Sequence, residues 1–500
     1  MKNEIHMEES MRKLSFFLAA LLASAAASAS CGSYAPVVSN DSVTTQGEVT
    51  TAPEVEELSL PDDLDLGGMT IRVLNSQDYA GGEAEGDLVY EEIYKRNMKV
   101  EEELNVTFEF IDYLGADYQK VPAAVRQSVN AGSDDYDIIT CAGRLSLPLV
   151  SEGLYTSVND LPYVELEKPW WATDMLEAIS VNASDIRVLT GDITHCFLER
   201  LSCAFVNQRL LEEVGGLTNT DLYEIVLNGG WTFDKMSEIG KNAYRDLNGD
   251  SQADEADQYM LGHYLTYAFT RSAYSSGLSF TDRDSVGYPV LAVNNERTVS
   301  LIETLTDLFI KNENVIQLQT TSTYSSNNRA DKILFGAGQT MFMLERFYVA
   351  GWDELRNMKD DFCIVPYPKA AADVDTYRTV SDSNTLLFSV PVTAQKLTEI
   401  SAVLESMAYY GKQMISPVYY ETALKIKYTR DDMSSQMIDL ITENARTDFL
   451  YFNNLNGMGG EDGIFAQVYN NAGEGFSSLY ASLEEAAKTG ISDIIKALNS

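Results

Sequence analysis

The spacing of apolar residues between positions 69 and 140 alternates between two patterns. Short, mostly apolar runs predict β-strands, and the longer segments between them have the apolar spacing of amphipathic helices. We expect strands over residues 69–74, 107–111 and 136–140, and helices over residues 88–104 and 118–129. Strands that alternate with helices in this way predict right-handed crossovers and a parallel sheet.

A second region with the same alternation begins near residue 201, and 500 residues are too many for one hydrophobic core. The strands expected in it are 203–206, 340–344, 362–365 and 379–388, and the helices are 208–213, 233–243, 296–310 and 327–335. The strands at 362–365 and 379–388 are expected to return to the first region. The pattern therefore predicts two large α/β domains.

Two polar residues follow strands of the first expected sheet. Ligands of parallel sheets bind beyond the carboxyl ends of the strands. Asn75 follows the first strand and Arg144 follows the third, so both are candidate ligand-binding residues. An ordinary turn role is the alternative at both positions.

The first thirty residues are typical of a secretory signal. Arg12 and Lys13 precede an apolar run over residues 14–23, and small residues lead to Cys31. The position of Cys31 resembles a bacterial lipobox, in which this cysteine is lipidated, although Ser28 stands where that motif usually has Leu; simple cleavage near Ala29 is the alternative. We expect residues 1–30 to be a signal peptide. Residues 31–65 are rich in Ser, Thr, Val and Glu and predict a flexible tether.

Charge and cysteine usage limit the partners and the chemistry. The formal net charge of −39 and the scattered basic residues argue against binding to nucleic acid. The five cysteines form no CxxC pair. For Cys196 and Cys203 we favour buried free thiols over a disulfide bridge.

Catalytic motifs are sparse in this chain. It has three histidines, and it contains no GxSxG, GxxxxGK[ST] or GxGxxG sequence. Carboxylate pairs of the glycosidase type occur by chance among 75 acidic residues. We therefore do not expect an enzyme.

One loop has the spacing of a calcium site. The sequence DLNGDSQADEAD places acidic or amide side chains close to EF-hand spacing, with Ser251 where an EF-hand has Gly and an aspartate where it has Glu. The expected ligands, with a carbonyl from the fourth of them, are Asp246, Asn248, Asp250, Gln252, Asp254 and Asp257. We expect a structural calcium ion here, and a solvated acidic turn is the alternative.

Several motifs, taken together and in this order, resemble extracellular solute-binding proteins of carbohydrate importers (family 1). They are YDII at 136–139, KPWW at 168–171, GD at 191–192, NGGWTFDK at 228–235 followed by the calcium-like loop, DFCIVPYP at 361–368 and YETALKIKY at 420–428.

The resemblance implies a fold of the type II periplasmic-binding-protein kind, with two α/β lobes, hinge strands and a ligand cleft between the lobes. Lobe 1 would comprise residues 66–200 with a return segment at about 360–395. Lobe 2 would comprise residues 201–359 with the C-terminal helices at about 396–500. It also implies a monomer outside the cell that delivers its ligand to the permease of an ABC transporter.

A sugar offers apolar faces and a rim of hydroxyls, so its cleft needs aromatic and planar polar side chains. The candidates at cleft positions are Trp170, Trp171, Tyr267, Phe269, Tyr274, Arg346, Asp382 and Asn384. Packing, a surface ion pair or a turn role is the alternative at each. The expected function is carbohydrate capture for import by a lipoprotein, and the alternative is a cell-surface glycan-binding or sensor-presenting protein on the same fold.

Overall fold

The computed structural model describes residues 57–77, 87–264, 266–318, 330–424 and 432–499. The expected signal peptide, Cys31 and the tether as far as residue 56 lie outside the described residues. Within the described part of the chain, no helix is both long enough and apolar enough to cross a membrane.

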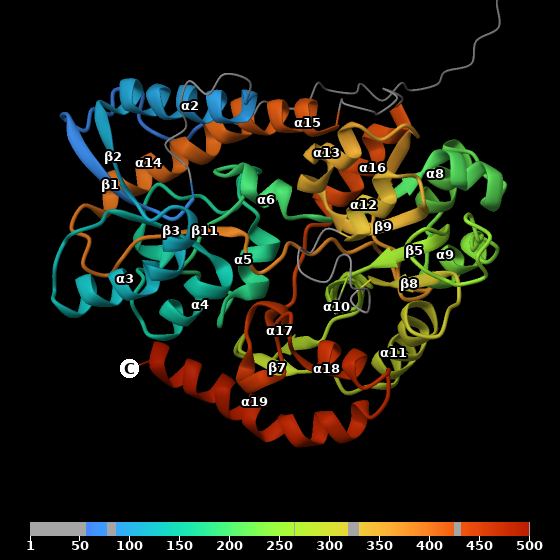
Figure 1. The fold of residues 1–500 in the computed structure, drawn as a ribbon. Coiled ribbons are helices and arrows are strands. Elements are labelled where there is room, and N and C mark those ends of the chain that lie inside the picture. The colour runs from blue at the N-terminus through green and yellow to red at the C-terminus, as the bar shows by residue number, and fades with distance from the viewer. Residues whose placement is uncertain (1–56, 78–86, 265, 319–329, 425–431, 500) are drawn as a thin grey trace, which may run out of the picture. The chain divides into compact units, whose positions relative to one another are not determined.

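The first sheet has the strand order β11-β3-β1-β2 (Figure 1). Its strands are β1 (Met69–Asn75), β2 (Val106–Asp112), β3 (Ile138–Ala142) and β11 (Leu386–Ser389). β1 is parallel to β2 and β3, whereas β11 is antiparallel to β3. The three predicted N-terminal strands are confirmed within two residues at each end, but the sheet is mixed rather than purely parallel.

Helix α2 (Leu88–Leu104) forms the crossover between β1 and β2 and matches its predicted limits. The Asp87 side chain accepts hydrogen bonds from the amides of Val89 and Tyr90 and so caps its first turn. Its inner face includes the buried residues Ile93 and Val100. Asn105 ends the helix in the left-handed conformation, with φ of 50°.

The segment predicted as one helix over 118–129 forms two helices. A 3₁₀ helix, η1 (Gly115–Lys120), precedes α3 (Val121–Asn130). Pro122 lies in the first turn of α3, where it has no N–H to donate to the carbonyl four residues earlier and its ring crowds that carbonyl. This accounts for the break.

The second sheet has the order β10-β4-β9-β5-β8. Its strands are β4 (Ser202–Asn207), β5 (Tyr259–His263), β8 (Val315–Gln317), β9 (Thr340–Arg346) and β10 (Phe362–Val365). The expected return of residues 362–365 to the first region is wrong, because β10 pairs antiparallel with β4. The four residues of β10 are all buried, so they show no alternation of apolar and polar positions. Such a strand carries no local signal for the sheet that it joins.

The chain crosses between the two sheets more than once, as expected, and two crossings pair with each other. Leu201, entering β4, forms an antiparallel bridge with Ser381, which precedes β11. The amide of Ser202 donates to the carbonyl of Val380 at 3.0 Å. The two crossing segments thus lie side by side between the lobes.

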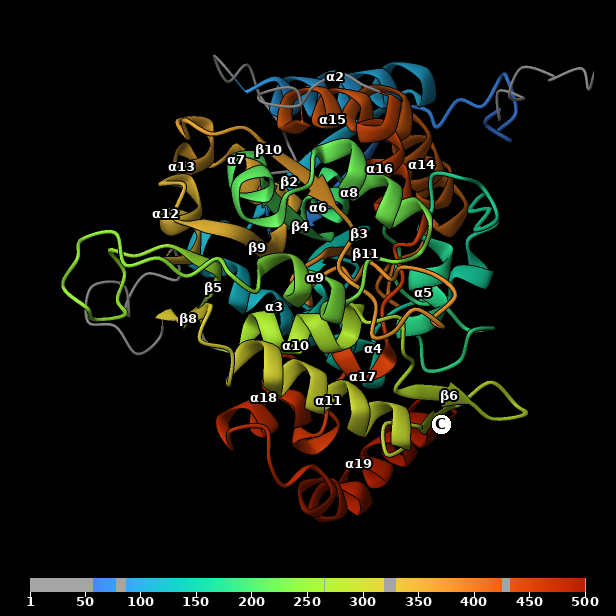
Figure 2. The same ribbon diagram turned by 90° about the vertical axis from the view of Figure 1, so that its right-hand side faces the viewer.

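Helices cover both sheets (Figures 1 and 2). Those between the strands are α4 (Gly143–Ser151), α5 (Thr173–Ile179), α6 (His195–Glu199), α7 (Gln208–Leu210), α8 (Asn219–Leu227), α9 (Phe233–Gly240), α10 (Tyr267–Ser275), α11 (Glu296–Phe309), α12 (Ala330–Gly336) and α13 (Asp353–Arg356). A π-helical turn, η3 (Leu211–Gly215), continues α7, and the hairpin of β6 (Thr281–Arg283) and β7 (Pro289–Leu291) follows α10.

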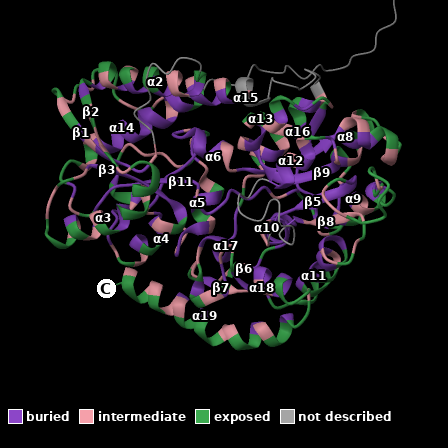
Figure 3. Ribbon diagram, in the orientation of Figure 1, coloured by how far each residue is buried: buried purple, intermediate pink, exposed green. Residues whose placement is uncertain are grey.

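The C-terminal helices do not all join the second lobe. They are α14 (Leu397–Tyr410), α15 (Ser416–Leu424), α16 (Asp432–Glu443), α17 (Phe449–Phe452), α18 (Ile464–Asn470) and α19 (Phe476–Leu498). α14 and α15 pack against α2, so they belong with the first sheet, whereas α16 packs against β10 and α8. α19 contacts α4 of the first region and also α18 and β7. Figure 2 shows α15 alongside α2. Figure 3 shows buried strands inside and an exposed outer face on α19.

Candidate functional site

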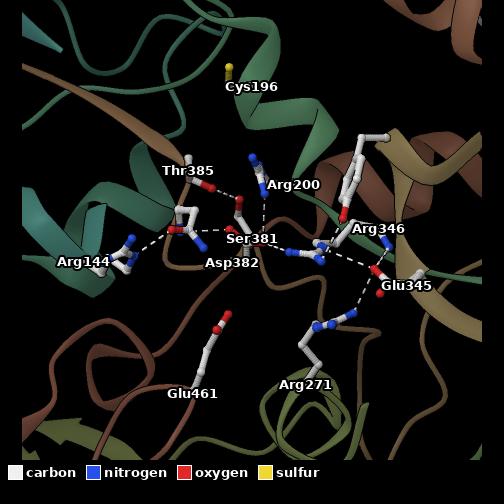
Figure 4. A network of polar contacts seen from close by, with 12 residues as sticks. Arg144, Cys196, Arg200, Arg271, Glu345, Arg346, Ser381, Asp382, Thr385 and Glu461 are labelled. Carbon is white, nitrogen blue, oxygen red and sulfur yellow. Dashed lines mark hydrogen bonds and ion pairs between the residues drawn. The ribbon is translucent and has the colours of Figure 1, made fainter. Parts of the chain in front are cut away.

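Asp382 lies next to the bridge between the two crossing segments, and two arginine side chains contact its carboxylate (Figure 4). Its fully buried carboxylate accepts hydrogen bonds from Arg346 at the end of β9 and from Arg200 Nη1, which lies 3.4 Å away. The Asn384 amide donates to its other oxygen at 2.8 Å. Burial alone would raise the pKa of Asp382, but the charges of Arg346 and Arg200 outweigh it and hold the pKa below its ordinary value.

Glu345 organises the second-lobe side of this group. Its carboxylate accepts hydrogen bonds from Lys332 Nζ at 2.6 Å, from Arg346 Nε at 3.1 Å and from Arg271 Nη1 at 3.2 Å. Burial opposes ionisation, but these three cations hold the pKa of Glu345 well below its ordinary value. We name the interlobe cluster by its members: Arg200, Arg271, Lys332, Glu345, Arg346 and Asp382.

Aromatic rings border the interlobe cluster. The Tyr348 hydroxyl accepts a hydrogen bond from Arg346 Nη2 at 3.0 Å, and the Arg200 guanidinium lies 5.3 Å from the centre of its ring. Trp352 meets Tyr348 edge to face at 5.7 Å. Both rings are half-buried, so each leaves part of its surface available to a ligand.

A cavity of about 480 Å³ lies at the carboxyl ends of β1 and β3. Its lining residues are Ser76, Gln77, Leu114, Gly115, Tyr118, Ala142, Arg200 and Asn384. Arg144 Nε donates to Asn384 Oδ1 at 2.7 Å, and Arg144 also donates to the Tyr118 hydroxyl. The cavity thus joins the first-lobe candidates to the interlobe cluster.

Four of the predicted ligand residues are brought together here. Arg144 contacts Asn384, and Arg346 contacts Asp382, which contacts Asn384. Asn75 is fully buried at the end of β1, where its side-chain amide donates to Asp112 at 2.9 Å. It is not among the residues that line the cavity.

The two predicted tryptophans lie elsewhere. The indole nitrogens of Trp170 and Trp171 donate to the two carboxylate oxygens of Glu405 on α14, each at 2.9 Å. Burial raises the pKa of Glu405 to about 7 despite these hydrogen bonds. The tryptophans border a separate cavity of about 560 Å³ that also includes Asp192 and Lys412.

The three aromatic candidates on α10 have different surroundings. Phe269 is fully buried and packs against Phe309 and Tyr469. Tyr274 is buried against Tyr451, with ring centres 4.6 Å apart. Tyr267 is half-buried, and burial together with the charge of Glu461 raises its pKa. Of the three, Tyr267 has the most surface available for a ligand.

Sequence reasoning did not select Arg200, Tyr348 or Trp352. Arg200 lies two residues before β4, so its place near a strand terminus was a usable signal. Tyr348 and Trp352 follow Arg346 within six residues, in a segment already identified as a candidate by Arg346.

The predicted calcium loop folds around its acidic side chains. Asp246 accepts hydrogen bonds from the amides of Gly249 and Ser251, and Asp257 accepts one from Leu247, at 2.6 to 3.0 Å. Ser251 adopts the left-handed conformation, with φ of 62°, at the position where an EF-hand uses Gly. The departure from the EF-hand sequence at Ser251 is thus compatible with the turn.

A second group of possible metal donors adjoins the cavity. Within the described ranges, His195, Cys196 and Glu199 form a group of three whose donor atoms all lie within 4.8 Å of one another, and no three carboxylates of the loop do so. The Cys196 thiol donates to Gln77 Oε1 at 2.9 Å. Cys196 and Cys203 are both buried free thiols, as predicted.

No family model and no curated protein matches this sequence. Among solved structures, UgpB from Mycobacterium tuberculosis, in complex with glycerophosphocholine, is similar over 86% of this chain and 99% of its own, with 13% identity and a TM-score of 0.54. A cyclo/maltodextrin-binding protein complexed with maltotetraose is similar over 86% of this chain and 96% of its own, with 10% identity and a TM-score of 0.51. These similarities and the two sheets confirm the expected two-lobed, periplasmic-binding-protein-like α/β fold.

Proposed function

We propose that this protein captures a sugar or oligosaccharide between its two lobes and delivers it to the permease of an ABC transporter. The interlobe cluster is the observation that carries the proposal. It lies where the chain crosses between the lobes, and in it Arg346 of β9 meets Asp382 beside β11. Two solved structures similar to this chain contain maltotetraose and glycerophosphocholine, which are both polar, hydroxyl-bearing ligands.

The chemistry around the cluster suits a sugar. Asn384 and the arginines have planar polar groups that pair with adjacent hydroxyls, and Tyr348 and Trp352 offer ring surface for apolar sugar faces. A ligand that contacts both lobes favours the closed arrangement by the contacts it makes only there. None of these steps requires a catalytic group, so we propose binding without turnover.

A thermal-shift screen of the purified protein against a glycan panel tests this function. A glycan present at 100 times its dissociation constant stabilises the fold by about 2.7 kcal/mol, which for a folded body of this size raises Tm by about 3 °C. We expect at least one saccharide to do so. If amino acids or peptides shift Tm and no saccharide does, the proposed ligand class is wrong.

We further propose that Cys31 carries a lipid that holds the protein on the outer face of the cell membrane, where it acts as a monomer. The signal-like segment that ends at Cys31 supports this anchor. Cys31→Ala is expected to move the protein from the membrane fraction to the soluble extracellular fraction. Retention of the variant in the membrane fraction would show a different anchor.

We also propose that the loop from Asp246 to Asp257 binds calcium as a structural ion. Its four aspartates repel one another without a cation, and the turn at Ser251 has the conformation that the EF-hand spacing requires. Calcium at about 100 times its dissociation constant should raise Tm by about 3 °C relative to chelator. Asp250→Ala should remove most of that difference, and identical melting curves of the wild-type protein with calcium and with chelator would exclude the site.

A further inference from the structure

The cavity at the ends of β1 and β3 differs in charge from the rest of the molecule. The chain as a whole carries a formal charge of −39. None of the described residues that line the cavity is acidic, and Arg200 is one of them. A cavity that excludes carboxylates in so acidic a protein has a local potential that favours anions.

Arg144 adds a second positive charge at the edge of the cavity. It is exposed, and its guanidinium donates to Asn384 Oδ1 at 2.7 Å and to the Tyr118 hydroxyl, which are both neutral. These two partners line the cavity, so the charge of Arg144 lies at its edge. Neither of these acceptors carries a negative charge, so the positive charge of Arg144 remains available to a ligand.

Arg200 is only partly neutralised. It shares the carboxylate of Asp382 with Arg346, and its own contact of 3.4 Å is long for a hydrogen bond. Its Nε is buried and has no hydrogen-bond partner among the described residues. A buried donor without a partner favours an acceptor supplied by a ligand.

Two acidic groups, Asp382 and Glu199, favour the charged form of Arg200, and neither of them lines the cavity. Other acidic groups nearby have partners of their own. Asp112 accepts a hydrogen bond from Asn75 at the end of β2, and Asp117 pairs with Lys120 at 2.7 Å. Figure 4 shows Glu461 on the other side of Asp382 from Arg200, below the network. Burial and the charge of Asp382 raise the pKa of Glu461.

We propose that the sugar bound by this protein is anionic, with a carboxylate placed against Arg144 and Arg200 at the cavity. This inference rests on the proposed function and specifies its substrate class. Guanidinium groups bind planar carboxylates through paired, charge-assisted hydrogen bonds, which are stronger than those to neutral hydroxyls. A uronic acid differs from its neutral hexose by this one group, so the site discriminates between them.

Matched saccharides test the proposal directly. Calorimetry on the full chain compares galacturonic acid oligomers with the galactose oligomers of equal length and linkage, and glucuronic acid oligomers with their glucose counterparts. We expect an acidic member to bind at least about tenfold more tightly than its neutral counterpart, with an affinity that falls as salt rises. Arg144→Gln and Arg200→Gln should each reduce that preference. The control Arg126→Gln should not, because Arg126 of α3 lies in an exposed ion pair with Glu152.

The outcomes separate this inference from the proposed function. If a neutral member binds as tightly as its acidic counterpart, the anionic ligand is refuted and sugar capture stands. If neither member of any pair binds and no glycan of the wider panel shifts Tm, both proposals are refuted. If the preference exists but survives in both arginine variants, the carboxylate is bound elsewhere and the assignment of the cavity is wrong.

Discussion

Glu345→Gln is expected to lower the free energy of unfolding by about 3–5 kcal/mol. Glu345 is buried and is the shared partner of Lys332, Arg271 and Arg346, whose side chains are at most 10% exposed. Glutamine keeps the size of the side chain but removes the negative charge, so three buried cations lose their common counter-ion. Urea unfolding measures the difference in the free energy of unfolding, provided that its dependence on urea concentration (the m-value) is the same in both proteins.

A matched variant separates this effect from the simple loss of an ion pair. Glu238→Gln removes the partner of Lys235 in a pair that is largely exposed, with 63% of the Glu238 side chain accessible. Its expected effect is below about 0.5 kcal/mol. If Glu345→Gln costs no more than Glu238→Gln, the interlobe cluster does not stabilise the fold as described.

The second large effect is a pH dependence that arises from Glu405. Its ordinary pKa is 4.5, and burial in the folded protein raises the pKa to about 7. The folded state therefore binds this proton more tightly than the unfolded state, and stability falls as pH rises from about 4.5 to about 7. A shift of this size corresponds to about 3 kcal/mol.

Glu405→Gln isolates this contribution, because glutamine does not titrate. The free energy of unfolding of the wild-type protein, relative to this variant, should fall by about 3 kcal/mol across that interval. Denaturant unfolding at several pH values measures it. A difference between the two proteins that is constant with pH would show that Glu405 ionises normally.

The sequence pattern predicted correctly those elements that are specified by residues within or next to them. Helix α2 has its cap at Asp87, its apolar stripe and its end at Asn105 within one continuous segment, and its limits were predicted correctly. The pairing of β10 was predicted wrongly, since which sheet a fully buried strand joins depends on distant residues. The same holds for the C-terminal helices that pack on α2.

In the candidate site, too, individual residues could be predicted from the sequence but their contacts with distant residues could not. Arg346 and Asp382 were each selected from their places near strands, but their mutual contact spans 36 residues and is visible only in the structure. Trp170 and Trp171 resembled a sugar platform, whereas their shared partner Glu405 lies more than 230 residues away in the chain. The neighbours of a tryptophan in sequence cannot distinguish a ring exposed to a ligand from one that is buried and hydrogen-bonded.

Calorimetric titration of variants from the two sides of the cleft tests the central claim, that the ligand is held between the lobes. The titrant is the saccharide that shifts Tm most. Asn384→Ala, beside β11, and Tyr348→Ala, after β9, should each weaken binding about tenfold or more, while the exposed control Asp373→Ala should leave it unchanged. Unchanged affinity in both cleft variants would contradict the claim.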